Sequence, residues 1–277
     1  MQRDGIPYIL GFCVAVCLFC AVFVSSSAVG LKETQDLNKD LDRKSKVLSV
    51  AGLIEEGAPA SAETIQSLFE KRIKAVVVDL ESGSVNEELT KTVEKFDQKK
   101  DAKDPKMGMD VTPPHKFGLK RVARNAVVYL VSKGDMDAEG NGFQLLQYIF
   151  PVEGKGLWST LYGFLAVGPD FNEIKGLTFY QHAETPGLGG EVDNPNWKKK
   201  WIGRQVYGDS RAQGPKIKVK KGQAGSVTED PHEVDGLSGA TLTSNGVSYL
   251  LDYWMGERGF LKFIENEARK AAAGTAG

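Results

Sequence analysis

The chain has 277 residues, of which 41% are hydrophobic and 26% are charged, and its 35 basic and 36 acidic residues give a net charge of −1. This balance lacks the excess of lysine and arginine that nucleic-acid-binding proteins carry, so a nucleic-acid partner is not expected. The residues after the apolar N-terminus are numerous enough to bury the core of one or two domains.

An uncharged segment near the start of the chain runs from Gly5 to Leu31. A helix of about 20 apolar residues crosses the ~30 Å hydrocarbon layer of a membrane, so this segment is long enough to span it with some tilt. A cleaved signal peptide is the alternative, because Ser26 and Ala28 are small residues of the kind that precede a cleavage site. The apolar core, residues 6–24, is longer than that of a signal peptide, and its one preceding positive charge is offset by an adjacent acid. We therefore predict that residues 1–31 form a retained membrane anchor helix.

The basic residues that follow the anchor, between Lys32 and Lys46, bear on its orientation. The positive-inside rule favours keeping them in the cytoplasm, whereas long domains cross the membrane largely regardless of flanking charge. Charge alone therefore leaves both orientations open.

All three cysteines of the chain, Cys13, Cys17 and Cys20, lie within the predicted anchor. Their spacing places them on one helical face, which suits a metal or cluster ligand set, a helix contact, or simple packing. We favour packing, because cysteine behaves as a small apolar residue in such surroundings. The rest of the chain has no cysteine, which excludes disulfides there.

The part that follows the anchor, residues 32–115, is predicted to be helical and mixed in structure. A polar helical extension of the anchor comes first, and Ser61 is placed to cap the next helix. The β-branched run 74–80 predicts a strand, and residues 89–96 predict a short helix. Residues 97–116 are charged and contain three prolines, which is typical of a surface loop.

The remaining part, residues 116–277, is predicted to form the main domain. Runs of β-branched and aromatic residues between glycine-containing turns predict antiparallel strands, and helical patterns gather toward the C-terminus. This order predicts an α+β fold: a single N-terminal transmembrane helix, then a soluble domain in which helices flank an antiparallel sheet. The expected strands are 125–131, 143–152, 161–167, 174–181 and 216–220, and the expected helices are 194–203, 244–255 and 258–271.

The connector after the first of these strands resembles the start of a calcium loop, with Asp135, Asp137 and Glu139 at alternate positions. Its twelfth position is Leu146, where an EF-hand needs a bidentate glutamate, so a hairpin loop is predicted instead. The three histidines of the chain also lack ligand spacing, and no metal site is predicted.

Three loops combine glycines with hydroxyl or apolar side chains: residues 153–163, 182–192 and 235–246. Glycine lets backbone approach a ligand closely, although each loop taken alone equally suits a tight turn of a sheet. The third loop precedes an apolar helix, and Thr243 or Ser244 is predicted to cap that helix, which is expected to start shortly afterwards. Free N–H groups at a helix N-terminus attract anions, so this loop predicts phosphate binding without identifying the ligand.

The sequence DGLSGAT, Asp235 to Thr241, resembles the flavinylation motif of membrane redox complexes, Asp-Gly-x-Ser-Gly-Ala-Thr. The stretches GKGLWSTLYGFLAV and ETPGLGGEV are similar to other parts of the same FMN-binding domain, in the right order. With the anchor and WKKKWIGRQVYG, the resemblance covers nearly the whole chain and indicates the flavin-bearing C-subunit family of the sodium-translocating NADH:quinone oxidoreductases. The G subunits of Rnf electron-transport complexes share the motif and are the alternative, but LWSTLYGFLAV and GGEVDNPNW are more similar to the sodium-pump family.

The resemblance implies that Thr241 carries FMN through a phosphoester bond, attached by a separate flavin transferase that recognises the motif. It also implies that residues of all three loops line the flavin. Three of these residues have an alternative role: Thr243 as a helix cap or phosphate-side donor, Trp158 as a core aromatic, and Glu184 as a turn residue. The other cofactor-binding residues that the resemblance implies are Ser238, Gly239, Ala240, Leu157, Thr185 and Leu188.

The function that the resemblance implies is electron transfer within a translocase that couples NADH oxidation and ubiquinone reduction to sodium export. The expected partners are the other subunits of the complex, of the A, B, D, E and F types, and the membrane. The chain would be a single-pass protein of the bacterial cell inner membrane with its FMN domain in the periplasm. No acid–base pair or substrate pocket is visible, so no catalytic residue for NADH is expected. A flavin-bearing sensor or assembly subunit, or an anchored scaffold, is the alternative.

Overall fold

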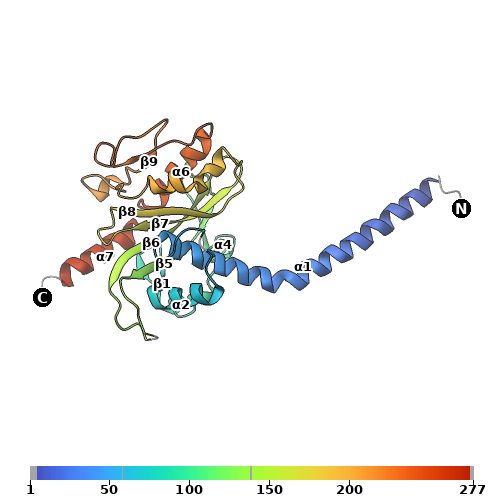
Figure 1. Ribbon diagram of the computed structural model, residues 1–277, viewed down its shortest axis with the longest axis horizontal. Coiled ribbons are helices and arrows are strands. Elements are labelled where there is room, and N and C mark those ends of the chain that lie inside the picture. Colours follow the sequence, from blue (N-terminus) through green and yellow to red (C-terminus); the bar gives the residue numbers. More distant parts are fainter. Residues whose placement is uncertain (1–4, 58, 138, 275–277) are drawn as a thin grey trace. The chain divides into compact units, whose positions relative to one another are not determined.

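Figure 1 shows the computed structural model, which describes residues 5–57, 59–137 and 139–274. The chain divides into two compact units, residues 1–43 and 44–277.

The first unit consists of the long helix α1, Ile6–Val50, whose last turns belong to the second unit. Its apolar side chains are exposed along the first half, and the helix is long and apolar enough to cross a membrane. Cys13, Cys17 and Cys20 are exposed as well. The prediction of an N-terminal apolar helix with a polar helical extension is confirmed for the described residues. Residues 1–4 of the predicted anchor 1–31 lie outside them.

Helix α2, Ala62–Arg72, begins at the predicted cap, where the Ser61 hydroxyl accepts the N–H of Thr64 at 3.2 Å. The chain passes directly from α2 into strand β1, Ile73–Asp79, because β-branched residues replace the helix formers. The three valines of β1 are buried, as expected for a strand that lies between two other strands of a covered sheet.

The centre of the second unit is a six-stranded antiparallel sheet with the order β2-β1-β5-β6-β7-β8. The α+β fold with an antiparallel sheet and helices is therefore confirmed. The longest strands form the β5–β8 meander that the alternating apolar runs predict. The strands besides β1 are β2 (Ser84–Val85), β5 (Asn125–Ser132), β6 (Leu145–Lys155), β7 (Thr160–Val167) and β8 (Ile174–Gln181).

Shorter elements surround the sheet. Two small two-stranded pairs, β3–β4 and β9–β10, lie outside it, and the two C-terminal helices are the longest of these elements. The elements are α3 (Glu87–Thr90), η1 (Val93–Lys95), α4 (Gln98–Asp101), β3 (Gly108–Asp110), β4 (Arg121–Ala123), η2 (Gly189–Asp193), α5 (Pro195–Lys199), η3 (Arg211–Gln213), β9 (Lys218–Val219), β10 (Glu233–Val234), α6 (Thr241–Trp254) and α7 (Leu261–Gly274).

Several of the predicted segments differ in the structure. Residues 89–96, predicted as one short helix, contain the end of α3 and the whole of η1 instead, and the expected helix 194–203 shortens to α5. Residues 97–116, predicted as a loop, contain α4 and β3, because the Asp97 carboxylate caps α4 and β4 supplies the strand partner of β3. The expected strand 216–220 shortens to β9, which pairs with only two residues of β10. The pairings of β3 with β4 and of β9 with β10 depend on partners distant in sequence, which local patterns do not reveal.

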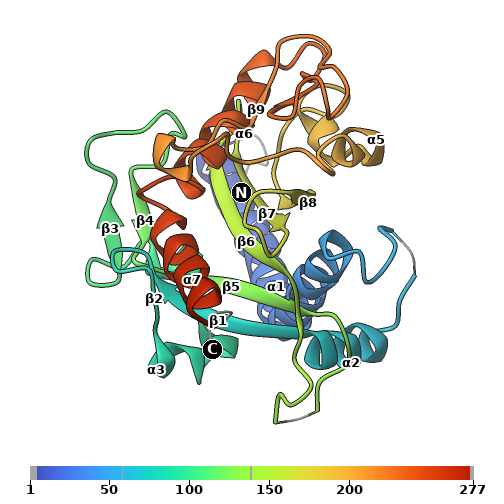
Figure 2. The same ribbon diagram turned by 90° about the vertical axis from the view of Figure 1, so that its left-hand side faces the viewer.

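The two faces of the sheet carry different partners. On one face β6 lies against α6, where Gly154 permits a close approach, since an added Cβ would lie 2.6 Å from the Leu250 Cβ. Helix α7 also lies against the sheet (Figure 2), and its Phe263 packs on Tyr148 and Phe150 on this face. On the other face the Gln147 amide donates to the Ala51 carbonyl just after α1, at 2.8 Å. The sheet thus fixes the position of α6, which begins in the third glycine loop.

The predicted parts 32–115 and 116–277 share this sheet, because β1 pairs with β5 along its whole length. The assignment of residues 116–277 as the FMN-binding portion stays a prediction. Residues 275–277 of that portion lie outside the described residues.

Candidate functional site

The candidate site is built from three loops, which we call the first loop (153–163), the second loop (182–192) and the third loop (235–246). The first loop connects β6 to β7, the second follows β8, and the third leads into α6. The fold brings them together, because β6, β7 and β8 are neighbours and α6 packs on β6.

Helix α6 begins at Thr241, earlier than the sequence predicts. Its N-cap, Ala240, makes no side-chain cap, and Thr243 and Ser244 lie inside the first turn, so the prediction that either caps the helix is wrong. Their hydroxyls have other partners: Thr243 donates to Glu184 at 2.7 Å, and Ser244 accepts the N–H of Leu237 at 3.1 Å. The first backbone hydrogen bond along α6 runs from the Ser244 N–H to the Ala240 carbonyl. The N–H groups of residues 241–243 therefore have no partner within the helix, and a ligand can bind them.

The turn before α6 depends on Gly239 and Asp235. Gly239 has φ +69°, a left-handed conformation that suits glycine, and an added Cβ would lie 2.9 Å from the Leu188 Cδ2. Asp235 fixes the start of the loop, because its carboxylate accepts the Ala224 N–H at 3.1 Å and pairs with the Lys200 ammonium. These contacts leave Ser238 and Gly239 exposed and direct the chain into α6 at Thr241.

Glu184 of the second loop joins all three loops. Its buried carboxylate accepts the N–H groups of three consecutive residues of the first loop at 2.9–3.1 Å, and the hydroxyl of the third of them at 3.0 Å. The Thr243 hydroxyl of α6 completes the set at 2.7 Å. The three first-loop residues are Leu157, Trp158 and Ser159.

The protonation state of Glu184 follows from these bonds. Burial acts to raise the pKa of its carboxyl, but the hydrogen bonds from Thr243 and from the three backbone N–H groups outweigh burial and lower the pKa. Glu184 is therefore held as a carboxylate with five donors, and its oxygens face the protein rather than a ligand.

Four apolar side chains remain exposed around this arrangement. Trp158 is 73% exposed and Leu242 is 60% exposed, and Leu157 and Leu188 are each nearly half exposed. Four large exposed apolar side chains around one glycine-rich site form an apolar surface that suits a planar ligand.

Comparisons with known proteins identify the family. A model of the FMN-binding domain family matches residues 156–256, which include most of the first loop and all of the other two. The C subunit of the Na(+)-translocating NADH-quinone reductase of Pseudomonas aeruginosa is 45% identical over 258 residues, which cover 91% of this chain and 92% of the relative. Its counterpart in Vibrio alginolyticus is 41% identical over 264 residues and 95% of each chain.

The chain belongs to the family of C subunits of the Na(+)-translocating NADH-quinone reductases.

Solved structures of this family have the same fold. The crystal structure of Shewanella oneidensis NqrC superposes with a TM-score of 0.71 at 32% identity and covers 83% of this chain and 98% of its own. The C subunit of the Na(+)-translocating NADH-quinone reductase from Parabacteroides distasonis gives a TM-score of 0.59 at 25% identity, with 84% and 96% covered. The prediction of the sodium-translocating type, rather than the Rnf type, is confirmed by these relatives.

The structure brings together the loops that carry the residues implied by the family resemblance for the flavin site. Trp158 is exposed, so the alternative of a core aromatic is wrong. Glu184 and Thr243 are buried and bonded to each other, which makes them framework residues of the site. Thr185 is an exposed turn residue whose carbonyl accepts the N–H groups of Leu188 and of Gly190. Ala240 is buried beneath the turn.

Two residues of the site were not predicted. Ser159 bonds Glu184 and accepts the Ala183 N–H at 2.9 Å, and His182 accepts the Glu184 N–H through Nδ1 at 3.2 Å. A hydroxyl beside the Leu-Trp pair was the one sequence signal for Ser159, whereas His182 had none. Within the described residues, no group of three or more His, Cys, Asp or Glu side chains is placed to hold a metal ion.

A second buried carboxylate, Glu153, lies on β6 at the start of the first loop. Glu153 stands opposite Tyr162 of β7. Burial raises the pKa of the Glu153 carboxyl to about 7, although the positive charge of Lys99 acts in the opposite direction. Glu153 therefore favours the protonated form in the folded protein under mildly acidic conditions.

Replacing Glu153 with glutamine is expected to remove a pH-dependent loss of stability. Between the ordinary glutamate pKa of about 4.3 and the folded-state pKa of about 7, the unfolded chain releases this proton before the folded chain does. Stability therefore falls as the pH rises through this interval and levels off above it, by about 4 kcal/mol at most. Urea unfolding of both proteins near pH 5 and near pH 8 measures the difference, and equal pH dependence in the two would contradict this assignment.

Proposed function

We propose that this chain carries FMN covalently through a phosphoester on Thr241 and transfers electrons as one subunit of a Na(+)-translocating NADH-quinone reductase. The observation that carries the proposal is the difference in exposure and hydrogen bonding among the hydroxyls around the motif. Thr243 and Ser244 are buried and bonded within the protein, whereas Thr241 is exposed at the first position of α6. Among the hydroxyls at the start of this helix, Thr241 is the one that a modifying enzyme can reach.

The surroundings of Thr241 suit the phosphate of FMN. The N-terminus of a 14-residue helix presents unpaired N–H groups and the positive end of its dipole. A phosphate attached to the Thr241 hydroxyl lies beside these groups, so its charge is stabilised without a basic side chain. Ser238 is also exposed, but it precedes the Gly239 turn and lies outside the helix terminus.

The apolar rim suits the flavin ring. Trp158 and Leu157 of the first loop and Leu188 of the second would cover the ring and exclude water from its faces. Bound FMN supplies one- and two-electron transfer, while the protein residues position it and set its surroundings. The buried hydroxyls that follow Thr241 bond Glu184 and Leu237 rather than a histidine base, which agrees with attachment by a separate flavin transferase.

The family places the chain in a multi-subunit complex, and helix α1 is suited to anchor it. We propose a single-pass arrangement in the bacterial cell inner membrane, with the FMN domain in the periplasm and the other subunits as partners. A covalent link keeps the flavin in place where free FMN is scarce, because its occupancy does not follow mass action. The chain would then relay electrons while other subunits bind NADH, ubiquinone and sodium.

Mass spectrometry of the peptide 222–258 tests the proposal directly. The protein is purified from membranes of cells that also contain the flavin transferase, and the peptide is fragmented to locate the added group. We expect FMN, with its phosphate retained, to be attached to Thr241, because this hydroxyl is exposed and lies at the helix N-terminus. An unmodified peptide, or FMN on Ser238, would contradict the proposal.

A further inference from the structure

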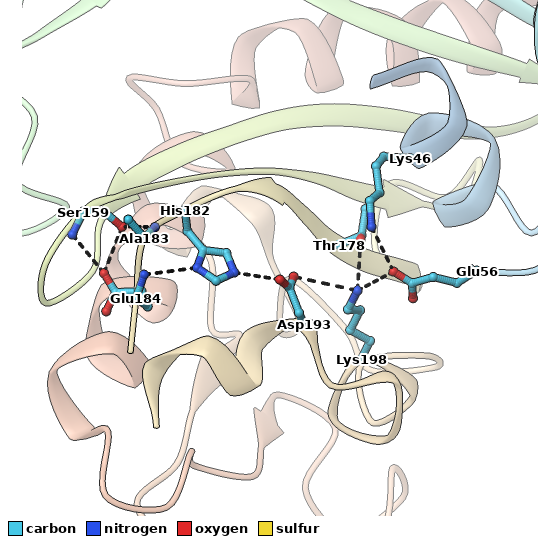
Figure 3. A network of polar contacts seen from close by, with 9 residues as sticks. All are labelled: Lys46, Glu56, Ser159, Thr178, His182, Ala183, Glu184, Asp193 and Lys198. Carbon is cyan, nitrogen blue, oxygen red and sulfur yellow. Dashed lines mark hydrogen bonds and ion pairs between the residues drawn. The ribbon is translucent and has the colours of Figure 1, made fainter. Parts of the chain in front are cut away.

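A chain of polar contacts extends from the second loop away from the candidate flavin site (Figure 3). His182 Nδ1 accepts the N–H of Glu184 at 3.2 Å, and its Nε2 lies 2.7 Å from Asp193 Oδ2. Because Nδ1 is an acceptor, Nε2 carries the proton and donates to Asp193. Asp193 therefore orients the imidazole that holds the backbone of Glu184.

The next member of the chain is Lys198 of α5, a buried cation. Its ammonium lies 2.5 Å from Glu56 Oε1, 3.4 Å from Thr178 Oγ1 and 3.9 Å from Asp193 Oδ1. A buried ammonium requires close carboxylates, since loss of a partner leaves an uncompensated charge. Lys198 thus links Asp193, at the end of the second loop, to Glu56.

Glu56 lies in the segment that follows α1 and also pairs with Lys46 in the last turns of that helix, at 3.4 Å. This segment is outside residues 156–256, which match the FMN-binding domain family. The polar chain therefore connects a part of the protein that the family model does not cover to the residue that joins the three loops.

We propose that His182, Asp193, Lys198 and Glu56 form a brace that positions the second loop, and that Glu56 is a positioning residue for the flavin site. The inference rests on the proposed function only in taking the bound molecule to be FMN. Each contact supports the next. Glu56 neutralises Lys198, so that Asp193 can accept the proton of His182 Nε2–H, and His182 Nδ1 accepts the Glu184 N–H.

Loss of Glu56 has a definite consequence in this arrangement. Asp193 becomes the remaining carboxylate near the buried Lys198 ammonium, and the two are drawn together from 3.9 Å. Asp193 Oδ2 then leaves His182, the imidazole loses its fixed orientation, and the Glu184 N–H loses its acceptor. The second loop consequently opens more often, and its bonds to the first loop weaken.

Hydrogen exchange of the full-length protein in detergent, prepared without flavin, tests the brace. We expect Glu56→Gln to speed amide exchange in the peptide that contains Glu184 about tenfold, the effect of 1.4 kcal/mol in a local opening equilibrium. Glu55→Gln is the matched control, since this neighbouring exposed residue has the same charge and is not a member of the brace. Unchanged exchange in Glu56→Gln, or equal acceleration in Glu55→Gln, would overturn the proposal.

A double variant separates a brace from a general loss of stability. His182→Ala breaks the inner link but leaves Asp193 beside Lys198, so adding Glu56→Gln to it should not speed exchange further. Additive effects of the two changes would overturn the proposal. A shift in the visible circular dichroism of the flavin in holoprotein Glu56→Gln, absent in Glu55→Gln, is the second expected result. The exchange measurement needs no flavin, so absence of FMN from the wild-type chain would contradict the proposed function without deciding the brace.

Discussion

Thr241→Ala is expected to remove covalent flavin from the chain completely while leaving the fold intact. The Thr241 side chain is exposed at the first position of α6, so its removal breaks no buried contact, and alanine is a good residue for a helix start. The neighbouring hydroxyls cannot substitute, because Thr243 is 1% exposed and Ser244 is 5% exposed, and both are hydrogen-bonded within the protein. Flavin fluorescence of the denatured chain in a gel measures the loss.

Thr228→Ala is the matched control for this variant. It removes an exposed hydroxyl that lies outside the motif Asp235 to Thr241, and it should keep wild-type flavin fluorescence. When all three proteins are prepared without flavin, the stabilities of the two variants from melting curves should agree with the wild type within about 0.5 kcal/mol, as surface substitutions usually do. Covalent flavin in Thr241→Ala would show that the motif presents a different hydroxyl, and loss of flavin in Thr228→Ala would show that the effect is not specific to Thr241. Retained quinone reduction in complexes that contain Thr241→Ala would instead favour a sensor or assembly role.

Glu184→Gln is expected to have the largest effect on the stability of the second unit. The carboxylate accepts bonds from three backbone N–H groups and two hydroxyls, whereas a glutamine offers one acceptor oxygen and turns an NH2 group toward some of these donors. Leaving buried donors unpaired costs about 1–3 kcal/mol each, so a loss on the order of 3 kcal/mol is expected. Denaturant unfolding at neutral pH measures it.

The pH dependence of this effect has a defined sign. The folded-state pKa of Glu184 is lowered, so its contribution is fully present above the ordinary glutamate pKa of about 4.3 and is lost as the pH falls through the folded-state pKa. The difference in stability between wild type and Glu184→Gln should therefore shrink on acidification. Glu191→Gln, which removes the same charge from the second loop but only a bond from Asn194, is the control and should cost much less. Equal losses in the two variants, or a difference that grows in acid, would contradict the role of Glu184.

Together these expectations describe a flavin site with two kinds of residue. Thr241, Trp158 and the leucines of the rim face outward, where the proposed covalent FMN would exchange electrons with partner subunits. Glu184, Thr243 and Ser159 face inward and hold the loops in place. A rigid frame around a bound flavin suits electron relay, because the protein contributes position and surroundings rather than acid–base catalysis.

The sequence by itself determined the long apolar helix, the antiparallel strands of the meander, the family and the three loops. These features are local: length, alternation of apolar residues, glycine-containing turns and the continuous motif DGLSGAT each lie within one stretch of chain. The start of α6 was misplaced, since serine and threonine near a helix start usually act as caps, and here their hydroxyls bond residues outside the helix.

Only the tertiary structure decided what each residue of the loops does. Glu184 appeared as a turn residue or a flavin contact until the fold placed its carboxylate under three N–H groups 25–27 residues away and a hydroxyl 59 residues away. Trp158 was ambiguous until burial was known, and the brace from His182 to Glu56 joins residues 126 positions apart in the chain. Hydrogen-bond partners and exposure depend on which strands are neighbours, and sequence periodicity carries no information about such distant pairings.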